Sequence, residues 1–232
     1  MKAGKTIVAD IDVFEISPLI SNAFYMRNRN TFGLNMGIMQ QPLFEYDFPS
    51  AAKYGFIGDV IGHEITHGFD EDGVEFNLYG REELWVGKEA FQNFTKSAEC
   101  LVHQYNGFCF PGKFCVDGEN TLSENIADLG GLIASHASWS ALSSKFQDKD
   151  YKPKGLKTYT WEQIFFMVYA NSWCSYEDET NDIGFLLPGS ASSHASNRAR
   201  VYGTLQNMQQ FADAFKCPVG SYMNPKEKCK VW

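Results

Sequence analysis

Hydrophobic and polar residues follow two different periodicities along this chain. Near the amino end, the strings NAFYM and TFGLNMGIM are separated by the polar turn RNRN and predict two short strands, at residues 22–26 and 31–39. Later segments carry apolar residues three or four positions apart, which is typical of helices packed on a core. The predicted helices cover residues 51–69, 83–104, 121–146, 161–174 and 204–215. The pattern predicts an α+β fold, mostly helical with a small sheet near the amino terminus.

The segments between these elements are rich in polar and turn-forming residues. Residues 106–120 predict a loop or a hairpin, residues 152–160 a linker within the domain, and residues 176–197 an irregular segment. No change in composition marks a boundary along the chain. We therefore expect residues 1–232 to form one domain.

Charge and hydropathy narrow the classes of function. The chain has 28 acidic and 20 basic residues, a net charge of −8, and no basic stripe, which argues against a nucleic-acid partner. It contains no run of about 18 apolar residues, so no transmembrane segment is expected. The amino-terminal string MKAGKTIVADIDVFEIS has acidic residues where a signal peptide would have its apolar core, so no signal peptide is expected either.

Six cysteines bear on the compartment in which the protein works. None of them forms a C-x-x-C pair, which argues against a cysteine zinc site. Their even number, with Cys109 and Cys115 bracketing the string FPGKF, favours disulfides and an oxidising compartment. The alternative is six buried free thiols in a cytosolic protein.

The string HEITH at residues 63–67 carries the clearest chemistry. Four residues make slightly more than one helical turn, so His63 and His67 share a face about 5–6 Å apart. Two imidazoles at that separation can bind one zinc ion, and Glu64 is placed to take a proton from a water at the metal. The alternative is a helix with two histidines by accident.

A catalytic zinc site needs a third protein ligand, and Glu124 is the candidate. Glu124 and Asp128 are four residues apart, so one carboxylate can bind the metal and the other can hold a ligand imidazole. However, Thr121-x-x-Glu124 is also a capping-box pattern, in which Glu124 only closes the helix start. Spacing alone leaves the two interpretations equal. His103 and His136 are isolated competitors that fit ordinary helix positions.

The strings HEITHGFD and ENIADLGG together resemble the paired signature of the neprilysin and endothelin-converting-enzyme family of zinc metallopeptidases. SNAFY resembles the family's substrate-binding strand, GIMQQPLF the segment after it, and the end of the chain from GTLQNMQQF to KCKVW the family's terminal block. The resemblance implies a zincin-like (thermolysin-like) catalytic domain with one zinc ion. It makes His63, His67 and Glu124 the zinc ligands and Glu64 the general base.

The resemblance also implies residues that act beside the metal. Asp128 becomes the residue that orients a ligand histidine, whereas Asp70 is a weaker candidate because an acidic loop is more often solvated. His194 becomes the residue that stabilises the tetrahedral intermediate, although Ser192 stands where the family has an acidic residue that orients this histidine. Without the resemblance, residues 194–200 would be interpreted as a solvated basic loop.

Substrate contacts are implied in the same way. Asn22 and Ala23 match family positions that hydrogen-bond the substrate main chain, and their alternative role is a plain edge strand. Arg200 matches a residue that binds a substrate carbonyl on the leaving-group side. Val60 and Trp173 are candidate walls of a pocket for a large apolar residue after the scissile bond, with core packing as their alternative.

Cysteine pairing can be predicted for two bridges. The resemblance pairs Cys100 with Cys229, whereas Cys109 and Cys115 bracket a five-residue loop and are expected to bridge each other. Cys174 and Cys217 match family cysteines whose partners lie in amino-terminal sequence that this chain lacks. They can remain free, pair with each other, or mark a polypeptide separated from its other lobe.

Chain length leaves two functions open. Family members are several times longer and are membrane-anchored or secreted, so an extracellular or cell-surface location is implied. The resemblance implies that residues 1–232 correspond to the family's carboxyl-terminal third, and we expect neither its amino-terminal lobe nor its transmembrane segment in this sequence. We expect a zinc endopeptidase or oligopeptidase that cleaves small peptides before apolar residues. The alternative is a truncated, weakly active or inactive zinc-binding paralogue or fragment. The sequence does not predict an oligomeric state.

Overall fold

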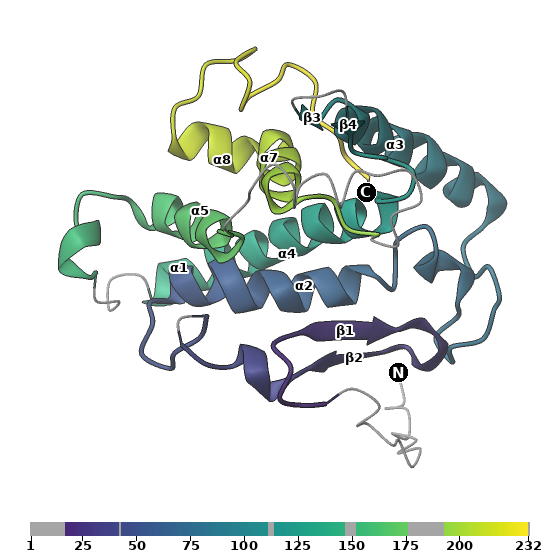
Figure 1. The fold of residues 1–232 in the computed structure, drawn as a ribbon, viewed down its shortest axis with the longest axis horizontal. Helices are drawn as coiled ribbons and strands as arrows, with labels where there is room; N and C mark the ends of the chain where they lie inside the picture. Colours follow the sequence, from purple (N-terminus) through teal and green to yellow (C-terminus); the bar gives the residue numbers. More distant parts are fainter. Residues whose placement is uncertain (1–16, 42, 111–113, 147–151, 176–192, 232) are drawn as a thin grey trace.

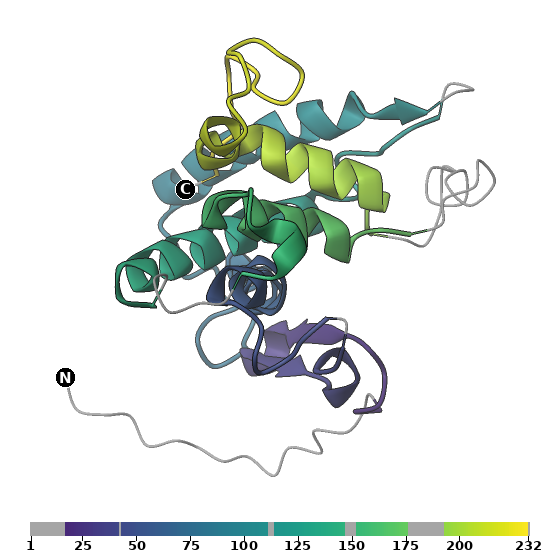
Figure 2. The same ribbon diagram turned by 90° about the vertical axis from the view of Figure 1, so that its left-hand side faces the viewer.

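A two-stranded sheet lies along one side of the molecule, and the helices are stacked on it in layers (Figures 1 and 2). The computed structural model describes residues 17–41, 43–110, 114–146, 152–175 and 193–231. Above the sheet in Figure 1 lie α2 (Asp59–Thr66), then α4 (Leu122–Phe146), then α7 (Asn197–Asn207). The predicted α+β fold, mostly helical with a small sheet near the amino terminus, is confirmed. The extent of the domain stays a prediction.

The sheet is an antiparallel hairpin of β1 (Ala23–Met26) and β2 (Thr31–Leu34). Its turn is short because Asn30 adopts a left-handed conformation, with φ of 45°, which asparagine tolerates better than most residues. The predicted second strand, 31–39, was too long. It ends at Leu34, and Met36–Ile38 forms a turn of 3-10 helix instead.

The predicted helix 51–69 is interrupted near its middle. It starts as α1 (Ser50–Lys53), widens into a π-helical turn over Tyr54–Gly58, and continues as α2. The hydroxyl of Ser135 in α4 donates a hydrogen bond of 2.6 Å to the Tyr54 carbonyl at this turn. Such π turns occur often near functional sites, and this one directly precedes the helix that carries the HEITH string.

Helices α2 and α4 approach so closely that their contact leaves no room for side chains. A Cβ atom on Gly131 would lie 2.5 Å from the backbone nitrogen of His63, and one on Gly62 would lie 2.6 Å from the Gly131 carbonyl oxygen. Only glycine fits at both positions without displacing backbone. The contact brings His63 of α2 and His67, which directly follows α2, next to the acidic first turns of α4.

Large aromatic side chains make up much of the main core. Trp139, Tyr105, Phe165, Phe166 and Tyr169 are all fully buried there. They come from α3 (Lys88–Asn106), α4 and α5 (Trp161–Ser172), so the two predicted helices 83–104 and 161–174 are confirmed with shifted ends. Among the described residues, no helix is both long and apolar enough to cross a membrane.

The prediction of one last helix over 204–215 was wrong. Two helices lie here, α7 and α8 (Gln209–Ala214), separated by the extended residue Met208. The start was missed because α7 buries polar residues, which hide the apolar periodicity. Its amino-terminal cap is Ser196, whose hydroxyl oxygen accepts a hydrogen bond from the Ala199 amide.

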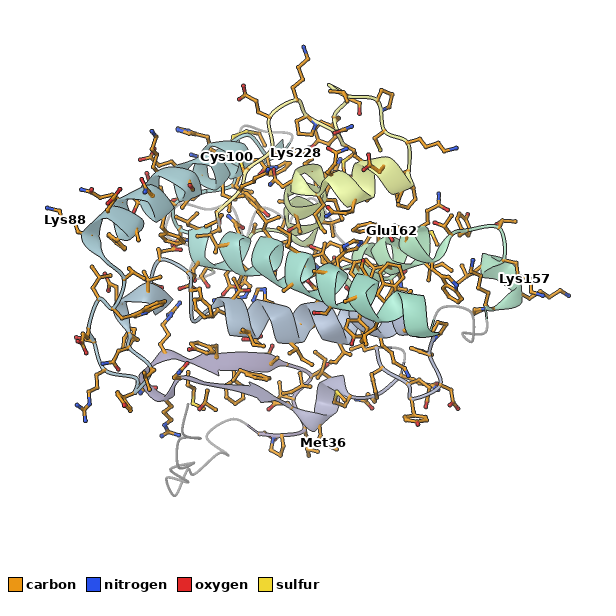
Figure 3. The ribbon with its side chains drawn as sticks, turned by 180° about the vertical axis from the view of Figure 1, so that it is seen from behind. Met36, Lys88, Cys100, Lys157, Glu162 and Lys228 are labelled. Carbon is orange, nitrogen blue, oxygen red and sulfur yellow. A yellow bond between two sulfur atoms is a disulfide. The ribbon has the colours of Figure 1, made fainter. Side chains whose placement is uncertain are left out.

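Both predicted disulfides are present. Cys100–Cys229 joins α3 to the carboxyl-terminal segment, and Figure 3 shows Cys100 beside Lys228 at this edge of the molecule. Cys109–Cys115 closes a hairpin of β3 (Cys109–Phe110) and β4 (Phe114–Cys115). Cys174 and Cys217 are free thiols, which is the first of the alternatives left open for them.

Candidate metal centre

Three side chains from two helices converge on one point. His63 Nε2 lies 3.1 Å from His67 Nε2 and 3.2 Å from Glu124 Oε2, and His67 Nε2 lies 3.7 Å from Glu124 Oε1. Among the described residues these are the group of ligand-type side chains whose donor atoms all fall within 4.8 Å of one another.

The geometry of this group fits a zinc ion. Zinc–nitrogen and zinc–oxygen bonds of about 2.0–2.1 Å with tetrahedral angles place the ligand atoms about 3.3 Å apart. The observed separations of 3.1 Å, 3.2 Å and 3.7 Å scatter around that value. Two imidazoles and one carboxylate are also the donor types that catalytic zinc sites use, with a fourth position open to water.

Glu124 faces the histidines and does not close a capping box. The backbone amide of Thr121, which a capping glutamate would bind, donates instead to the Asp117 carbonyl at 3.1 Å. The Thr121 hydroxyl donates to the same carbonyl. Burial would raise the pKa of Glu124, but its contacts with His194 and His63 hold it well below the ordinary range. The capping interpretation is therefore wrong.

A buried carboxylate holds the second nitrogen of His63. His63 Nδ1 lies 2.9 Å from Asp128 Oδ1, and Asp128 also accepts two hydrogen bonds from Arg200, of 2.8 Å and 2.7 Å. Burial alone would raise the pKa of Asp128, but the charge and hydrogen bonds of Arg200 and His63 lower it to about 2. The ionised carboxylate fixes the ring so that Nε2 points toward the cluster.

Asp70 contacts the second ring nitrogen of His67, as Asp128 does for His63. Asp70 Oδ2 lies 2.7 Å from His67 Nδ1, and Asp70 Oδ1 accepts hydrogen bonds from the backbone amides of Asp72 and Gly73. The residue is 0% exposed, so the interpretation of Asp70 as part of a solvated loop is wrong. Burial would raise its pKa, but the bonds from His67, from Ser123 and from the Gly73 amide lower it.

A cavity of about 540 Å³ opens beside the cluster. It is lined on one side by Asn22 and Ala23 of the hairpin and on the other by the three cluster residues and Glu64. Glu64 is 6% exposed, and burial raises its pKa while the two neighbouring histidines oppose that rise. Asn22 is exposed, and Ala23 is the first residue of β1.

His194 and Arg200 also line this cavity. His194 is about half exposed, with its Nε2 3.1 Å from Glu124 Oε2. Arg200 is 6% exposed, and its guanidinium lies 3.9 Å from the centre of the Trp173 ring. The interpretation of 194–200 as a solvated basic loop is therefore wrong, because helix α7 begins within this segment and turns Arg200 inward. Ser192 lies outside the described residues.

The competitor histidines do not reach the cluster. His136 is stacked on Phe166 in the core and pairs with Glu162, which explains its burial without a metal. His103 lies on α3.

Sequence reasoning missed three residues of the site. Arg27 and Ser123 both contact Asp70, and Asp59 is a buried carboxylate in the cavity wall. The one available signal was that Asp59 shares a helical face with His63, four residues on.

A helix with two histidines, a glutamate from a second helix and a glutamate beside them define the zincin class of metallopeptidase. The sequence matches the profile of Peptidase family M13 over residues 22–231, and the chain belongs to this family of zinc metallopeptidases. It is 40% identical over 220 residues to neprilysin-11 of Caenorhabditis elegans and 37% identical over 223 residues to endothelin-converting enzyme 1 of Rattus norvegicus. These alignments cover 94% and 95% of this chain.

A solved structure supports the same assignment. The zinc metalloprotease Zmp1 of Mycobacterium tuberculosis, in complex with an inhibitor, superposes with a TM-score of 0.84 at 27% sequence identity. The superposition covers 94% of this chain and 33% of Zmp1. This chain likewise spans only 26% of neprilysin-11 and 28% of endothelin-converting enzyme 1.

Proposed function

We propose that this protein hydrolyses small peptides as a zinc-dependent endopeptidase or oligopeptidase, with Glu64 as the general base. One observation carries the proposal. The donor atoms of His63, His67 and Glu124 surround a single point with zinc-like spacing, and the buried carboxylate of Glu64 lines the cavity next to it.

The first step is transfer of a proton from water to Glu64. Zinc held by His63, His67 and Glu124, one ion per chain, would supply Lewis acidity toward the peptide carbonyl and acidify the attacking water. Glu64 follows the first ligand directly, and its burial raises its pKa, so its carboxylate is a better proton acceptor than a solvated one. The water oxygen bonds to the carbonyl carbon, and the same carboxyl group then delivers the proton to the amine nitrogen as the C–N bond breaks.

The proposed role of the two carboxylates behind the histidines is to orient them. Asp128 holds His63 and Asp70 holds His67, each through Nδ1. Both imidazoles therefore present Nε2 to the metal position without rotating, which supports metal affinity.

The hairpin offers an edge along which a peptide backbone can bind. β1 pairs with β2 on one side, and Asn22 and Ala23 line the cavity. An extended peptide can hydrogen-bond to such a strand edge through its main chain, whatever its sequence. His194 and Arg200 lie across the cavity, where they can stabilise the oxyanion and bind a substrate carbonyl.

The cavity wall suggests a side-chain preference. Val60 and Trp173 lie in the wall together with Ile38 and Phe56, so apolar side chains make up part of the pocket beside the metal position. We assign this pocket to the residue that follows the scissile bond. Large side chains with apolar surface are expected there.

The setting that we propose is extracellular or at the cell surface. Two disulfides are present, and disulfides persist in oxidising compartments. The net charge of −8 gives no support for a nucleic-acid partner.

Cleavage of internally quenched peptides by the zinc-loaded chain tests this function. Turnover should be lost on chelation, return with added zinc, and fall by at least about a hundredfold in Glu64→Gln. A protein that binds zinc but cleaves no peptide would instead be the zinc-binding paralogue or fragment. Turnover that survives in Glu64→Gln would remove Glu64 from its role.

A further inference from the structure

One buried carboxylate in the cavity wall has no role in the steps above. Asp59 is the first residue of α2, one helical turn before His63, and it lines the same cavity as His63 and Glu64. It is 4% exposed, and its Oδ1 has no hydrogen-bond partner among the described residues. Buried polar atoms are nearly always paired, so an unpaired carboxylate oxygen here calls for an explanation.

The basic groups near Asp59 are engaged elsewhere. Arg200 donates hydrogen bonds from Nε and Nη2 to Asp128. His63 contacts Asp128 through Nδ1, and its Nε2 is one of the three ligand atoms of the metal cluster. Arg27, the other arginine of the cavity wall, pairs with Asp70 and Asp72. Among the described residues Asp59 therefore has no hydrogen bond at Oδ1, and the charges of His63 and Arg200 offset only part of the effect of its burial.

Burial of Asp59 makes its ionised form unfavourable. Burial, followed by the negative charge of Asp128, raises the pKa of Asp59 well above its ordinary range. An isolated buried carboxylate is unfavourable, and a cation that enters the cavity would compensate it.

The surroundings of Asp59 restrict which cation fits. Ile38, Phe56, Val60 and Trp173 contribute apolar surface to the same cavity, beside charged residues such as Glu64 and Arg200. Lysine and arginine side chains combine a long apolar stem with a terminal cation, so the stem can pack on such walls while the head reaches an acid. Protease pockets discriminate in this way, since an acid at the base of a pocket selects a basic side chain where an apolar slot does not.

We propose that Asp59 makes this pocket select a lysine or arginine side chain of the peptide substrate, at the position after the scissile bond. The inference rests on the proposed peptidase function, and it replaces a preference for wholly apolar side chains by one for side chains whose long apolar stem ends in a cation. Asp59 acts as a specificity-determining residue and takes no part in the proton transfers.

Paired peptides test the proposal. Two quenched peptides differ only in the residue after the scissile bond, which is lysine in one and methionine, of similar length and without charge, in the other. For the zinc-loaded chain, kcat/KM should be at least about tenfold higher for the lysine peptide, since a hydrogen bond to a charged group contributes that much. In Asp59→Asn the lysine-to-methionine ratio should fall by a similar factor. Asp213→Asn, which removes an exposed carboxylate from α8, should leave the ratio unchanged.

Equilibrium binding separates failure of this proposal from failure of the proposed function. In a Glu64→Gln background, calorimetry with zinc present should show the lysine peptide binding about tenfold more tightly than the methionine peptide. Adding Asp59→Asn should abolish that difference. Absence of turnover together with this binding difference would contradict the peptidase function and leave the pocket assignment in place. Equal binding of both peptides, or a ratio that Asp59→Asn does not change, would overturn the assignment of Asp59.

Discussion

Each histidine of the cluster uses one nitrogen for the metal position and the other for a buried carboxylate. Asp128, in α4, contacts Nδ1 of His63, whereas Asp70, in the loop directly after α2, contacts Nδ1 of His67. The two carboxylates have partners of their own: Arg200 for Asp128, and Arg27 for Asp70. Such outer contacts fix ring orientation and raise ligand basicity, so metal affinity depends on residues that never touch the metal.

Replacing Asp70 by asparagine should weaken zinc binding without removing a ligand. An amide is uncharged, so it polarises the His67 ring less than a carboxylate does. We expect zinc affinity to fall about 10–100-fold in Asp70→Asn, measured by competition with a chelating dye. Asp72→Asn is the matched control, because Asp72 is more than half exposed and also pairs with Arg27. Equal losses in the two variants would show that the Arg27 contacts matter and the His67 contact does not.

The sequence predicts contacts between residues that are close together in the chain better than contacts between distant ones. His63, Glu64 and His67 lie within five consecutive residues at the carboxyl end of α2, so their relation can be predicted from spacing alone. Glu124 is far away in sequence, and its own pattern fitted a helix cap equally well, so only the family resemblance selected it. The burial of Asp70 and the unpaired oxygen of Asp59 depend on how distant segments pack, and no local pattern encodes that.

At the scale of elements, the site depends on the contact between α2 and α4. Gly62 and Gly131 let the two backbones approach, and the ligands lie on the faces that this contact brings together. The sequence predicted both helices but not their closeness, because glycines within a helix are ambiguous when read alone. The division into α7 and α8 was also missed, since it follows from one extended residue, Met208, inside an otherwise helical pattern.

Gly131→Ala should destabilise the protein through this contact. The new methyl group would press on the backbone nitrogen of His63, which cannot move aside as a flexible side chain could. We expect a loss of about 1–3 kcal/mol in the free energy of unfolding, measured by urea denaturation. Gly155→Ala is the control, because an added Cβ there meets nothing within 4 Å, and its change should stay within about 0.5 kcal/mol. A Gly131→Ala protein as stable as this control would show that the helices have room to separate.

At the scale of the whole molecule, the carboxyl-terminal segment is tied back to α3. The Cys100–Cys229 disulfide spans 129 residues of sequence, whereas Cys109–Cys115 spans 6. The long bridge encloses α4, α5, α7 and α8, so it restrains the part of the unfolded chain that includes Glu124. The sequence predicted the short bridge from its spacing, but it predicted the long one only through the family resemblance.

The two bridges should differ in their contribution to stability. In the chain-entropy model, loss of the long bridge in Cys100→Ala/Cys229→Ala costs about 5 kcal/mol, and loss of the short one in Cys109→Ala/Cys115→Ala costs about 2 kcal/mol. Thermal unfolding of the two double variants beside the parent chain measures the difference. A larger loss on removal of the short bridge would contradict the entropic account.

The zinc content of Glu124→Ala tests the central claim. In that claim His63, His67 and Glu124 are the three protein ligands of a zinc site, and Glu64 is the general base and not a ligand. The chain, Glu64→Gln, Glu124→Ala and the exposed-residue control Glu119→Ala are dialysed against the same limiting concentration of zinc and analysed for metal. We predict one zinc per chain in the parent, in Glu64→Gln and in Glu119→Ala, and a clear loss in Glu124→Ala, which lacks one of three protein ligands. Full occupancy in Glu124→Ala, or loss of zinc in Glu64→Gln, would contradict the account.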